Sequence, residues 1–173
     1  MAQPVLKCQH LGIQFGGLKA VDDFNMEIGE SELVGSGISF CAVCDGAFFE
    51  NKEVLVIGGG NSALQEAVLL AKTCKKVTVV QNLAVLTGER SLQESLFQND
   101  RVEFVYSATV SSFRREGERI STALSINGQP AELFSDGVFV AIGLAPDNQP
   151  FEQLGSLQNG YIQAGEDCLT QTP

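Results

Sequence analysis

Two cysteines spaced for disulfide chemistry, Cys41 and Cys44, are the first candidates for a functional role, and Asp45 follows them directly. Two thiols separated by two residues can exchange with another disulfide, and a helix N-terminus lowers the pKa of a thiol placed there. A carboxylate at Asp45 could pass a proton to a departing thiolate. It could equally cap the start of a helix. The pattern predicts a redox dithiol with a candidate proton donor.

Two other interpretations of the cysteine pair are structural. Half of a zinc site would need a second cysteine pair or histidines, but the only histidine in the sequence is His10. The other three cysteines stand apart from one another, at Cys8, Cys74 and Cys168. The pair could also be two unbonded cysteines of the core. We expect no metal site and favour the redox interpretation.

A second candidate site is the glycine-rich segment 58–63, which lies between the apolar run 54–57 and an amphipathic stretch. This order matches the strand–G-x-G-x-x-A–helix fingerprint of dinucleotide binding, although a structural turn is the alternative. The first glycine allows a tight turn, the third lets the backbone approach a pyrophosphate, and the small alanine lets helix and strand pack. Helix amides and the helix dipole then favour the phosphates. The predicted cofactor residues are Gly58, Gly59, Gly60, Asn61, Ser62 and Ala63.

The choice of dinucleotide depends on the end of the second strand, where a carboxylate favours NAD and an arginine favours NADP. The sequence there is Gln81-Asn82-Leu83, which contains neither, and the nearest arginine is Arg90. Gln81 is the candidate cofactor residue of this strand. We expect weak binding of NADP or NAD, with the choice between them open.

The pattern of apolar residues predicts an α/β fold. Runs at 54–57, 77–80, 102–110 and 137–142 read as strands, and segments 61–74 and 91–97 read as helices. Asn127-Gly128 separates strands at 120–126 and 131–134, a strong hairpin signal. Segments 5–15 and 18–28 predict an N-terminal β-hairpin that turns at residues 16–17. We therefore expect a Rossmann-like parallel sheet with an inserted antiparallel β-meander, preceded by a β-hairpin.

Composition restricts the partners. The chain has 173 residues, 44% of them hydrophobic, and a formal net charge of −10. This charge argues against nucleic acid or an anionic membrane as a partner. No apolar stretch approaches the roughly 20 residues of a membrane span. Five cysteines do not indicate a disulfide scaffold. We expect a cytoplasmic location, no nucleic acid and no membrane.

The segment SFCAVCDGAFF at 39–49, the glycine loop and residues 138–146 together resemble the nucleotide domain of low-molecular-weight thioredoxin reductases. The resemblance spans about residues 29–151. In that family NADPH reduces FAD, FAD reduces the cysteine pair, and the dithiol reduces thioredoxin. The resemblance implies Cys41 and Cys44 as the redox pair, Asp45 as the proton donor and Gly143 as a further cofactor residue. It also implies a thioredoxin-like protein disulfide as partner and allows a homodimer.

Two features depart from that family. Neither half of its FAD domain is in the sequence, although residues 161–173 resemble the start of the returning FAD segment. The arginine cluster after the second strand is replaced by Gln81-Asn82-Leu83. We therefore expect a module of a pyridine-nucleotide-disulfide oxidoreductase that does not itself bind FAD and is not competent for full turnover. The alternative is a non-enzymatic truncated or chimeric domain that has inherited both motifs.

Residues 3–30 resemble another family, the opening hairpin of an ABC-transporter ATPase of the branched-chain amino-acid type. In that family an aromatic residue near Phe15 stacks on adenine, and a Walker A loop follows. The sequence has no G-x-x-x-x-G-K-[ST], so an ATPase is an unfavoured alternative. We divide the chain into a hairpin and linker at 1–35, a nucleotide-binding domain with the cysteine pair at 36–152, and an FAD-segment remnant at 153–173.

Overall fold

The fold was obtained from a computed structural model, which describes residues 4–15, 18–29, 33–143, 157–158, 161–167 and 169. The helical elements are α1 (Ala42–Asp45), the 3-10 turn η1 (Gly46–Phe49), α2 (Asn61–Leu70) and α3 (Arg90–Phe97). The central strands are β3 (Ile38–Ser39), β4 (Glu53–Ile57), β5 (Lys76–Val80), β6 (Val102–Val105) and β10 (Gly137–Val140). The other strands are β1 (Pro4–Phe15), β2 (Leu18–Gly29), β7 (Ala108–Glu116), β8 (Arg119–Ile126), β9 (Gln129–Ser135), β11 (Leu157–Gln158) and β12 (Tyr161–Ile162).

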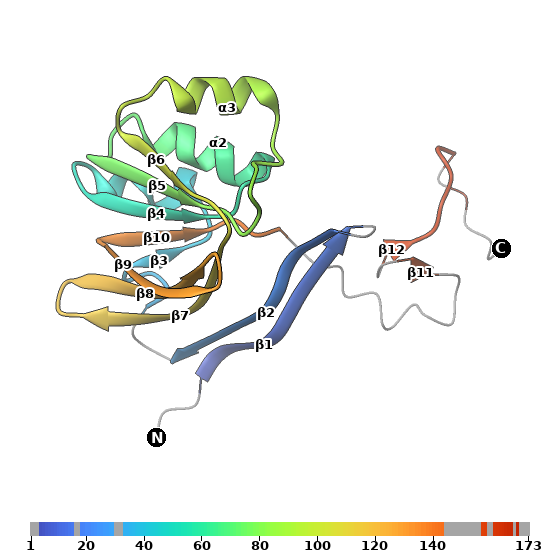
Figure 1. Cartoon of the computed structure of the whole chain (residues 1–173), viewed down its shortest axis with the longest axis horizontal. Helices are drawn as coiled ribbons and strands as arrows, with labels where there is room; N and C mark the ends of the chain where they lie inside the picture. The colour runs from blue at the N-terminus through green and yellow to red at the C-terminus, as the bar shows by residue number, and fades with distance from the viewer. Residues whose placement is uncertain are drawn as a thin grey trace.

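A parallel sheet in the order β3-β10-β4-β5-β6 forms the centre of the fold (Figure 1). Its central strands β4, β5 and β10 contribute mostly buried apolar side chains, as expected of a parallel sheet that is covered on both faces. Side chains alternate between the two faces. Val54 and Val56 of β4 join the core beneath the helices, whereas Leu55 and Ile57 join the core on the other face.

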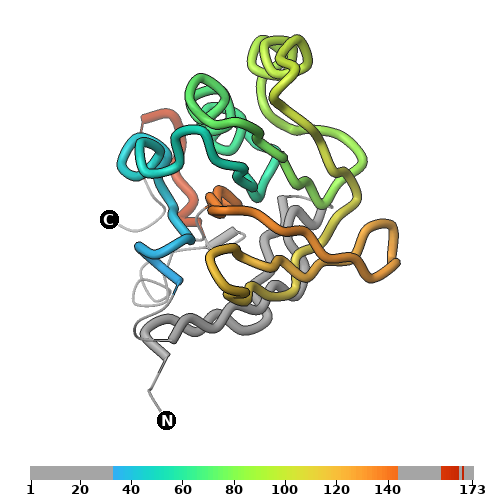
Figure 2. The backbone as a smooth tube through the Cα atoms, turned by 90° about the vertical axis from the view of Figure 1, so that its left-hand side faces the viewer, coloured from blue at the N-terminus to red at the C-terminus, as the bar shows by residue number. Residues whose placement is uncertain are grey.

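Helices α2 and α3 cover one face of the sheet, and the antiparallel sheet β7-β8-β9 covers the other (Figures 1 and 2). The helix-side core contains Leu64, Ala67 and Leu70 of α2, packed on the valines of β4 and β5. The opposite core joins Ile120 and Leu124 of β8 to the far face of the sheet. This arrangement confirms the expected α/β fold with a parallel sheet and a separate antiparallel sheet.

The meander differs from the sequence expectation at its start. A single strand was expected over 102–110, but the chain breaks at Ser107, whose φ of 51° ends β6. Residues from Ala108 onward then enter the antiparallel sheet as β7. The turn between β8 and β9 was predicted correctly. Asn127 and Gly128 have φ values of 50° and 80°, the pair of positive values that a two-residue hairpin turn requires.

Helix α2 is shorter than expected, and the N-terminal hairpin is found as expected. The helix expected over 61–74 ends at Leu70, and residues 71–73 form turns instead. At the N-terminus, β1 and β2 pair antiparallel from Pro4 opposite Gly29 to Phe15 opposite Leu18, which confirms the predicted hairpin. Its turn, residues 16–17, lies outside the described residues. Within the described part of the chain, no helix has the length and apolar character needed to cross a membrane.

Candidate functional site

The cysteine pair lies where β3 leaves the sheet and α1 begins. Cys41 and Cys44 form a disulfide, with their Cα atoms 5.3 Å apart. Cys41 occupies the N-cap of α1, and the backbone N–H of Cys44 donates to its Sγ at 3.1 Å. Cys44 is exposed and Cys41 is half-buried. The pair is therefore bonded and open to solvent on one side, which excludes the interpretation as two unbonded core cysteines.

Asp45 does not cap a helix start. It is the last residue of α1, and its side chain makes no capping hydrogen bond to the following 3-10 turn. Its Oδ2 accepts a hydrogen bond of 2.7 Å from the hydroxyl of Ser39, a buried residue of β3. The same hydroxyl accepts the backbone N–H of Cys41 at 3.0 Å. Asp45 is thus fixed through Ser39 to the backbone of residues 41–44, which we call the dithiol turn.

Helix α2 packs against the dithiol turn. Ala42, the residue after Cys41, is buried in the helix-side core. Its backbone N–H donates to the carboxyl of Glu66 on α2. Burial raises the pKa of Glu66 by more than this hydrogen bond lowers it. The carboxyl oxygen Oε2 of Glu66 is buried and has no hydrogen-bond partner among the described residues.

The glycine loop joins the carboxyl end of β4 to the N-terminus of α2. Gly58 has a φ of 129°, and a Cβ at this position would lie 2.4 Å from the carbonyl oxygen of Ala141. That Cβ would also lie 3.2 Å from Cβ of Ala63, which is fully buried where α2 meets the sheet. Gly58 and Ala63 therefore serve the close packing of strand, helix and the end of β10.

Gly60 and the residues after it have a different environment. A Cβ on Gly60 would meet only the hydroxyl of Thr87, at 3.8 Å, and Asn61 and Ser62 are exposed. The first backbone N–H groups of α2 have no carbonyl partner within the helix. Together with the helix dipole they form an environment that suits an anion. The residues present thus fit a pyrophosphate, with Gly60 on the side that a ligand would approach.

Gln81 lies beside this loop, but its side chain is used within the protein. It is only 4% exposed, its Nε2 donates to the carbonyl oxygen of Val85 at 3.1 Å, and its Oε1 accepts the backbone N–H of Asn82 at 3.1 Å. A Cβ on Gly59 would lie 2.5 Å from the Gln81 amide carbon. Gln81 therefore packs against the glycine loop and supports the segment that follows β5.

That segment contains residues that sequence reasoning missed. Backbone N–H groups of Thr87 and Gly88 donate to the carbonyl oxygen of Gly59 at 2.9 and 3.0 Å. Asn61 accepts the N–H of Glu89 at 2.6 Å and donates from Nδ2 to the Glu89 carboxyl at 3.3 Å. The carboxylate of Glu89 is therefore held beside the N-terminus of α2. The dipeptide Thr87-Gly88 was the available sequence signal, because its glycine indicates a turn.

The basic residues that follow the loop in sequence lie on two different elements, at the start of α3 and of β5. Arg90 is paired with Glu94 one helical turn along α3, and its side chain is 90% exposed. Lys75 and Lys76 lie at the start of β5, at the sheet edge opposite the glycine loop. Gly143, in contrast, follows β10 at the same edge as Gly58 and has a φ of 92°. Of the predicted cofactor residues, Gly143 is thus near the loop although distant in sequence.

The dithiol and the glycine loop share α2. Glu66, which contacts the dithiol turn, is five residues from Asn61, or about 8 Å along the helix axis at 1.5 Å per residue. Among the residues that the structure describes, no cluster of three or more His, Cys, Asp or Glu side chains could hold a metal ion. Because the two sulfurs are bonded to each other, Cys41 and Cys44 do not form half of a zinc site in this state.

The fold and site define an α/β domain with a glycine loop at the N-terminus of α2 and a disulfide-forming cysteine pair. Residues 15–173 match the family model described as pyridine nucleotide-disulphide oxidoreductase, and the chain belongs to this family. It is 41% identical over 147 residues to a thioredoxin reductase of Bacillus subtilis, a match that covers 83% of this chain and 46% of the relative. A thioredoxin reductase of Listeria monocytogenes is 38% identical over 149 residues, covering 84% and 47%. The chain spans about half the length of the curated relatives it matches.

Solved structures of thioredoxin reductases share the fold of this chain. The fold superposes on the thioredoxin reductase of T. acidophilum with a TM-score of 0.73 and 26% identity, covering 81% of this chain and 47% of that one. The Lactococcus lactis thioredoxin reductase gives a TM-score of 0.72 and 26% identity, covering 96% and 63%. The chain is a thioredoxin-reductase-like oxidoreductase module.

These comparisons also bear on the N-terminal hairpin. The family match begins at residue 15, within the segment that resembled an ABC-transporter ATPase. The resemblance to a transporter ATPase gains no support from the comparisons, and we do not retain it. The antiparallel pairing of β1 and β2 is found as expected, but a β-hairpin is common to many families and does not identify one.

Proposed function

We propose that this chain supplies the pyridine-nucleotide site and the redox dithiol of a thioredoxin-reductase-type enzyme. The observation that carries the proposal is the Cys41–Cys44 disulfide on a turn that is packed against the same helix as the glycine loop. In this assignment Gly60, Asn61 and Ser62 receive the dinucleotide pyrophosphate. Gly58, Ala63 and Gln81 act indirectly, because they shape the loop.

The proposed reaction at the dithiol is exchange with a protein disulfide. A thiolate of the reduced pair attacks the substrate disulfide, forms a mixed disulfide and displaces one substrate thiolate. The second cysteine then attacks the mixed disulfide, which restores the Cys41–Cys44 bond and transfers two electrons to the substrate. Each displaced thiolate takes up a proton, and Asp45 is the proposed donor.

An apolar surface around the pair supports a protein as the substrate. Phe40, Val43 and Phe48 flank the cysteines and are 46%, 84% and 72% exposed. Exposed apolar side chains gathered at one place typically contact a partner. A thioredoxin-like protein is the proposed substrate class, since both curated relatives described above are thioredoxin reductases.

A bound dinucleotide would be held at Gly60, Asn61 and Ser62 and would supply hydride-transfer chemistry to the proposed enzyme. The chain's own contribution is to hold the pyrophosphate at the N-terminus of α2. That a sample of these 173 residues binds no FAD stays a prediction, as do the weak discrimination between NADP and NAD, the cytoplasmic location and a homodimer. The domain division at residues 35 and 152 is likewise a proposal.

A single-turnover reaction tests the proposal without a flavin. The chain is reduced, separated from the reductant and mixed with an equal amount of oxidised thioredoxin. We expect transfer of two electrons to thioredoxin. Replacing both cysteines by serine should abolish the transfer. A reduced chain that leaves thioredoxin oxidised, while it still reduces glutathione disulfide, would reject the substrate class and retain the dithiol.

A further inference from the structure

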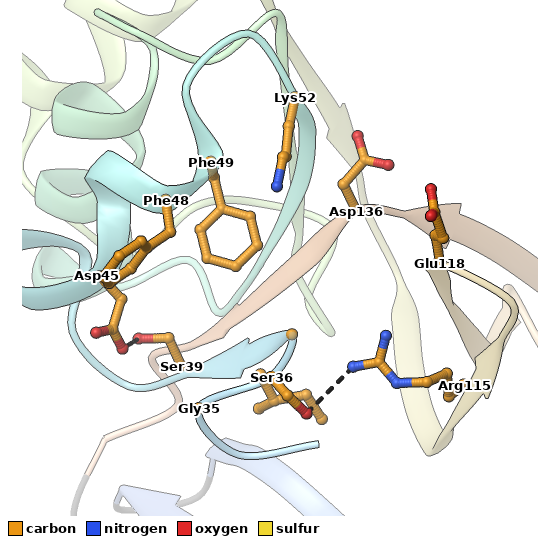
Figure 3. A pocket seen from close by; sticks show the side chains of 12 residues that line it. Gly35, Ser36, Ser39, Asp45, Phe48, Phe49, Lys52, Arg115, Glu118 and Asp136 are labelled. Atoms are coloured by element: carbon orange, nitrogen blue, oxygen red, sulfur yellow. Dashed lines mark hydrogen bonds between the residues drawn. The ribbon is translucent and has the colours of Figure 1, made fainter. Parts of the chain in front are cut away.

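The hydroxyl of Ser39 connects two groups of the dithiol turn. It accepts the backbone N–H of Cys41 at 3.0 Å and donates to Oδ2 of Asp45 at 2.7 Å, as Figure 3 shows for the second contact. The carbonyl oxygen of Cys41 lies farther from it, at 3.3 Å. A hydroxyl has one hydrogen to donate, and the shorter contact to the carboxylate takes it. The result is a continuous chain from Cys41 N–H through Ser39 to Asp45.

Ser39 itself is held rigidly. It lies in β3, is 3% exposed and pairs with Phe139 in the parallel register of β3 with β10. A buried hydroxyl in a sheet strand has few alternative orientations, and losing a partner would leave a polar group unsatisfied. The position of Ser39 therefore fixes the position of the Asp45 carboxyl relative to the cysteines.

We propose that Ser39 is a positioning residue, which orients Asp45 so that Oδ1 is the oxygen that carries the transferred proton. Oδ2 can accept the Ser39 hydrogen bond whether the carboxyl is ionised or protonated, so the bond persists through the reaction. In each half of the exchange, one S–S bond forms and one breaks. The displaced thiolate takes the proton from Oδ1, and solvent reprotonates Asp45. The inference rests on the proposed role of Asp45 as proton donor.

A double-mutant cycle separates this role from a purely structural one. The reduced chain is mixed with glutathione disulfide and quenched with an alkylating reagent at successive times. Peptide mapping by mass spectrometry then gives the rate at which Cys41–Cys44 closes. We expect Ser39→Ala to slow closure about tenfold, a part of the effect of a general acid. In the Asp45→Asn background, Ser39→Ala should have no further effect, because there is no carboxyl left to orient.

Ser135 provides a matched control. It is a buried serine of β9, 1% exposed, and its hydroxyl has no hydrogen-bond partner among the described residues. Ser135→Ala should leave the closure rate unchanged. A second variant, Ser39→Thr, keeps a hydroxyl at the site and should retain most of the rate. Circular dichroism of each variant confirms that it is folded.

Several outcomes would overturn the inference. The first is that Ser39→Ala slows closure by the same factor in the unmodified and the Asp45→Asn backgrounds, and the second is that Ser39→Ala leaves the rate unchanged although Asp45→Asn is slow. The third is a folded Ser39→Thr variant that is as slow as Ser39→Ala. The fourth is that Ser135→Ala slows closure as much as Ser39→Ala does. If Asp45→Asn itself is as fast as the unmodified chain, the proton-donor role fails first, and the role of Ser39 fails with it. The two failures are therefore distinguishable.

Discussion

The structure assigns opposite roles to two glycines of one loop, and this difference gives a sharp test of dinucleotide binding. Gly60 has φ −86° and ψ −179°, values that alanine adopts without strain, and its Cβ would meet only the Thr87 hydroxyl, at 3.8 Å. Gly58 has φ 129°, and its Cβ would lie 2.4 Å from a backbone oxygen of Ala141. Gly60→Ala should therefore act on ligand binding, and Gly58→Ala should act on folding.

The two variants should differ in their effects on the free energy of unfolding and on dinucleotide affinity. Alanine is a somewhat poorer helix N-cap than glycine, so Gly60→Ala should lower the free energy of unfolding by at most about 1 kcal/mol. Its methyl group should obstruct the pyrophosphate and weaken NADPH and NADH alike by at least about tenfold, or roughly 1.4 kcal/mol. Gly58→Ala combines backbone strain of about 1–3 kcal/mol with overpacking of about 1–3 kcal/mol. Its expected loss is about 2–6 kcal/mol, a large part of the roughly 5–15 kcal/mol that stabilises a domain.

Calorimetric titration with both dinucleotides measures binding, and urea denaturation measures stability. For the unmodified chain we expect weak binding and less than about a tenfold preference, because neither a carboxylate nor an arginine ends β5. Unchanged affinity in Gly60→Ala would mean that the loop is only a structural turn. A stable Gly58→Ala would contradict the assigned packing of β4 against the end of β10.

Four further predictions concern other groups. Glu89→Gln should shift the dinucleotide preference toward NADPH by about two- to fivefold in paired titrations, because it removes a screened negative charge near the N-terminus of α2; a shift toward NADH would be contrary to this. Burial raises the pKa of Glu66 above its ordinary value of 4.5, so the native state favours the protonated form and loses stability as pH rises through the folded pKa. Glu66→Gln should therefore stabilise the chain at pH 7 in urea titrations but not below pH 4.5. Burial also raises the pKa of the Cys74 thiol, so alkylation of Cys74 should be slow in the native chain and fast in urea, as peptide mapping can show. Finally, the purified chain should show no flavin absorbance near one FAD per chain, and a spectrum with stoichiometric flavin would refute this.

Local sequence signals predicted part of the fold and the cysteine pair that forms the disulfide. Asn127-Gly128 specified its turn because few other residues adopt two successive positive φ values. The strand, glycine loop and helix at 53–70 were predictable because periodicity and glycine spacing agree there. The break at Ser107 could not be predicted, because a non-glycine residue adopts a positive φ only where its surroundings stabilise it.

Contacts that depend on how the chain turns and folds back could not be predicted from local patterns. Gln81 was predicted as a cofactor residue, but its amide is used by the backbone of Val85 and Asn82. This depends on how residues 82–89 fold back over the glycine loop. Lys75 and Lys76 are close to the loop along the sequence, yet the direction of β5 places them at the opposite edge of the sheet. The contact of Ser39 with Asp45 depended on the short turn between β3 and α1, which periodicity does not describe.

The most direct test of the central claim is the redox equilibrium of the cysteines in the purified chain. The chain is equilibrated in glutathione buffers of increasing oxidising strength, quenched by alkylation and mapped by mass spectrometry. We predict that Cys41 and Cys44 form an intramolecular disulfide that opens and closes reversibly with the buffer, while Cys74 stays a free thiol. Free thiols at both Cys41 and Cys44 under mild oxidation, with Cys8, Cys74 or Cys168 paired instead, would contradict the assignment of this chain as a dithiol redox module.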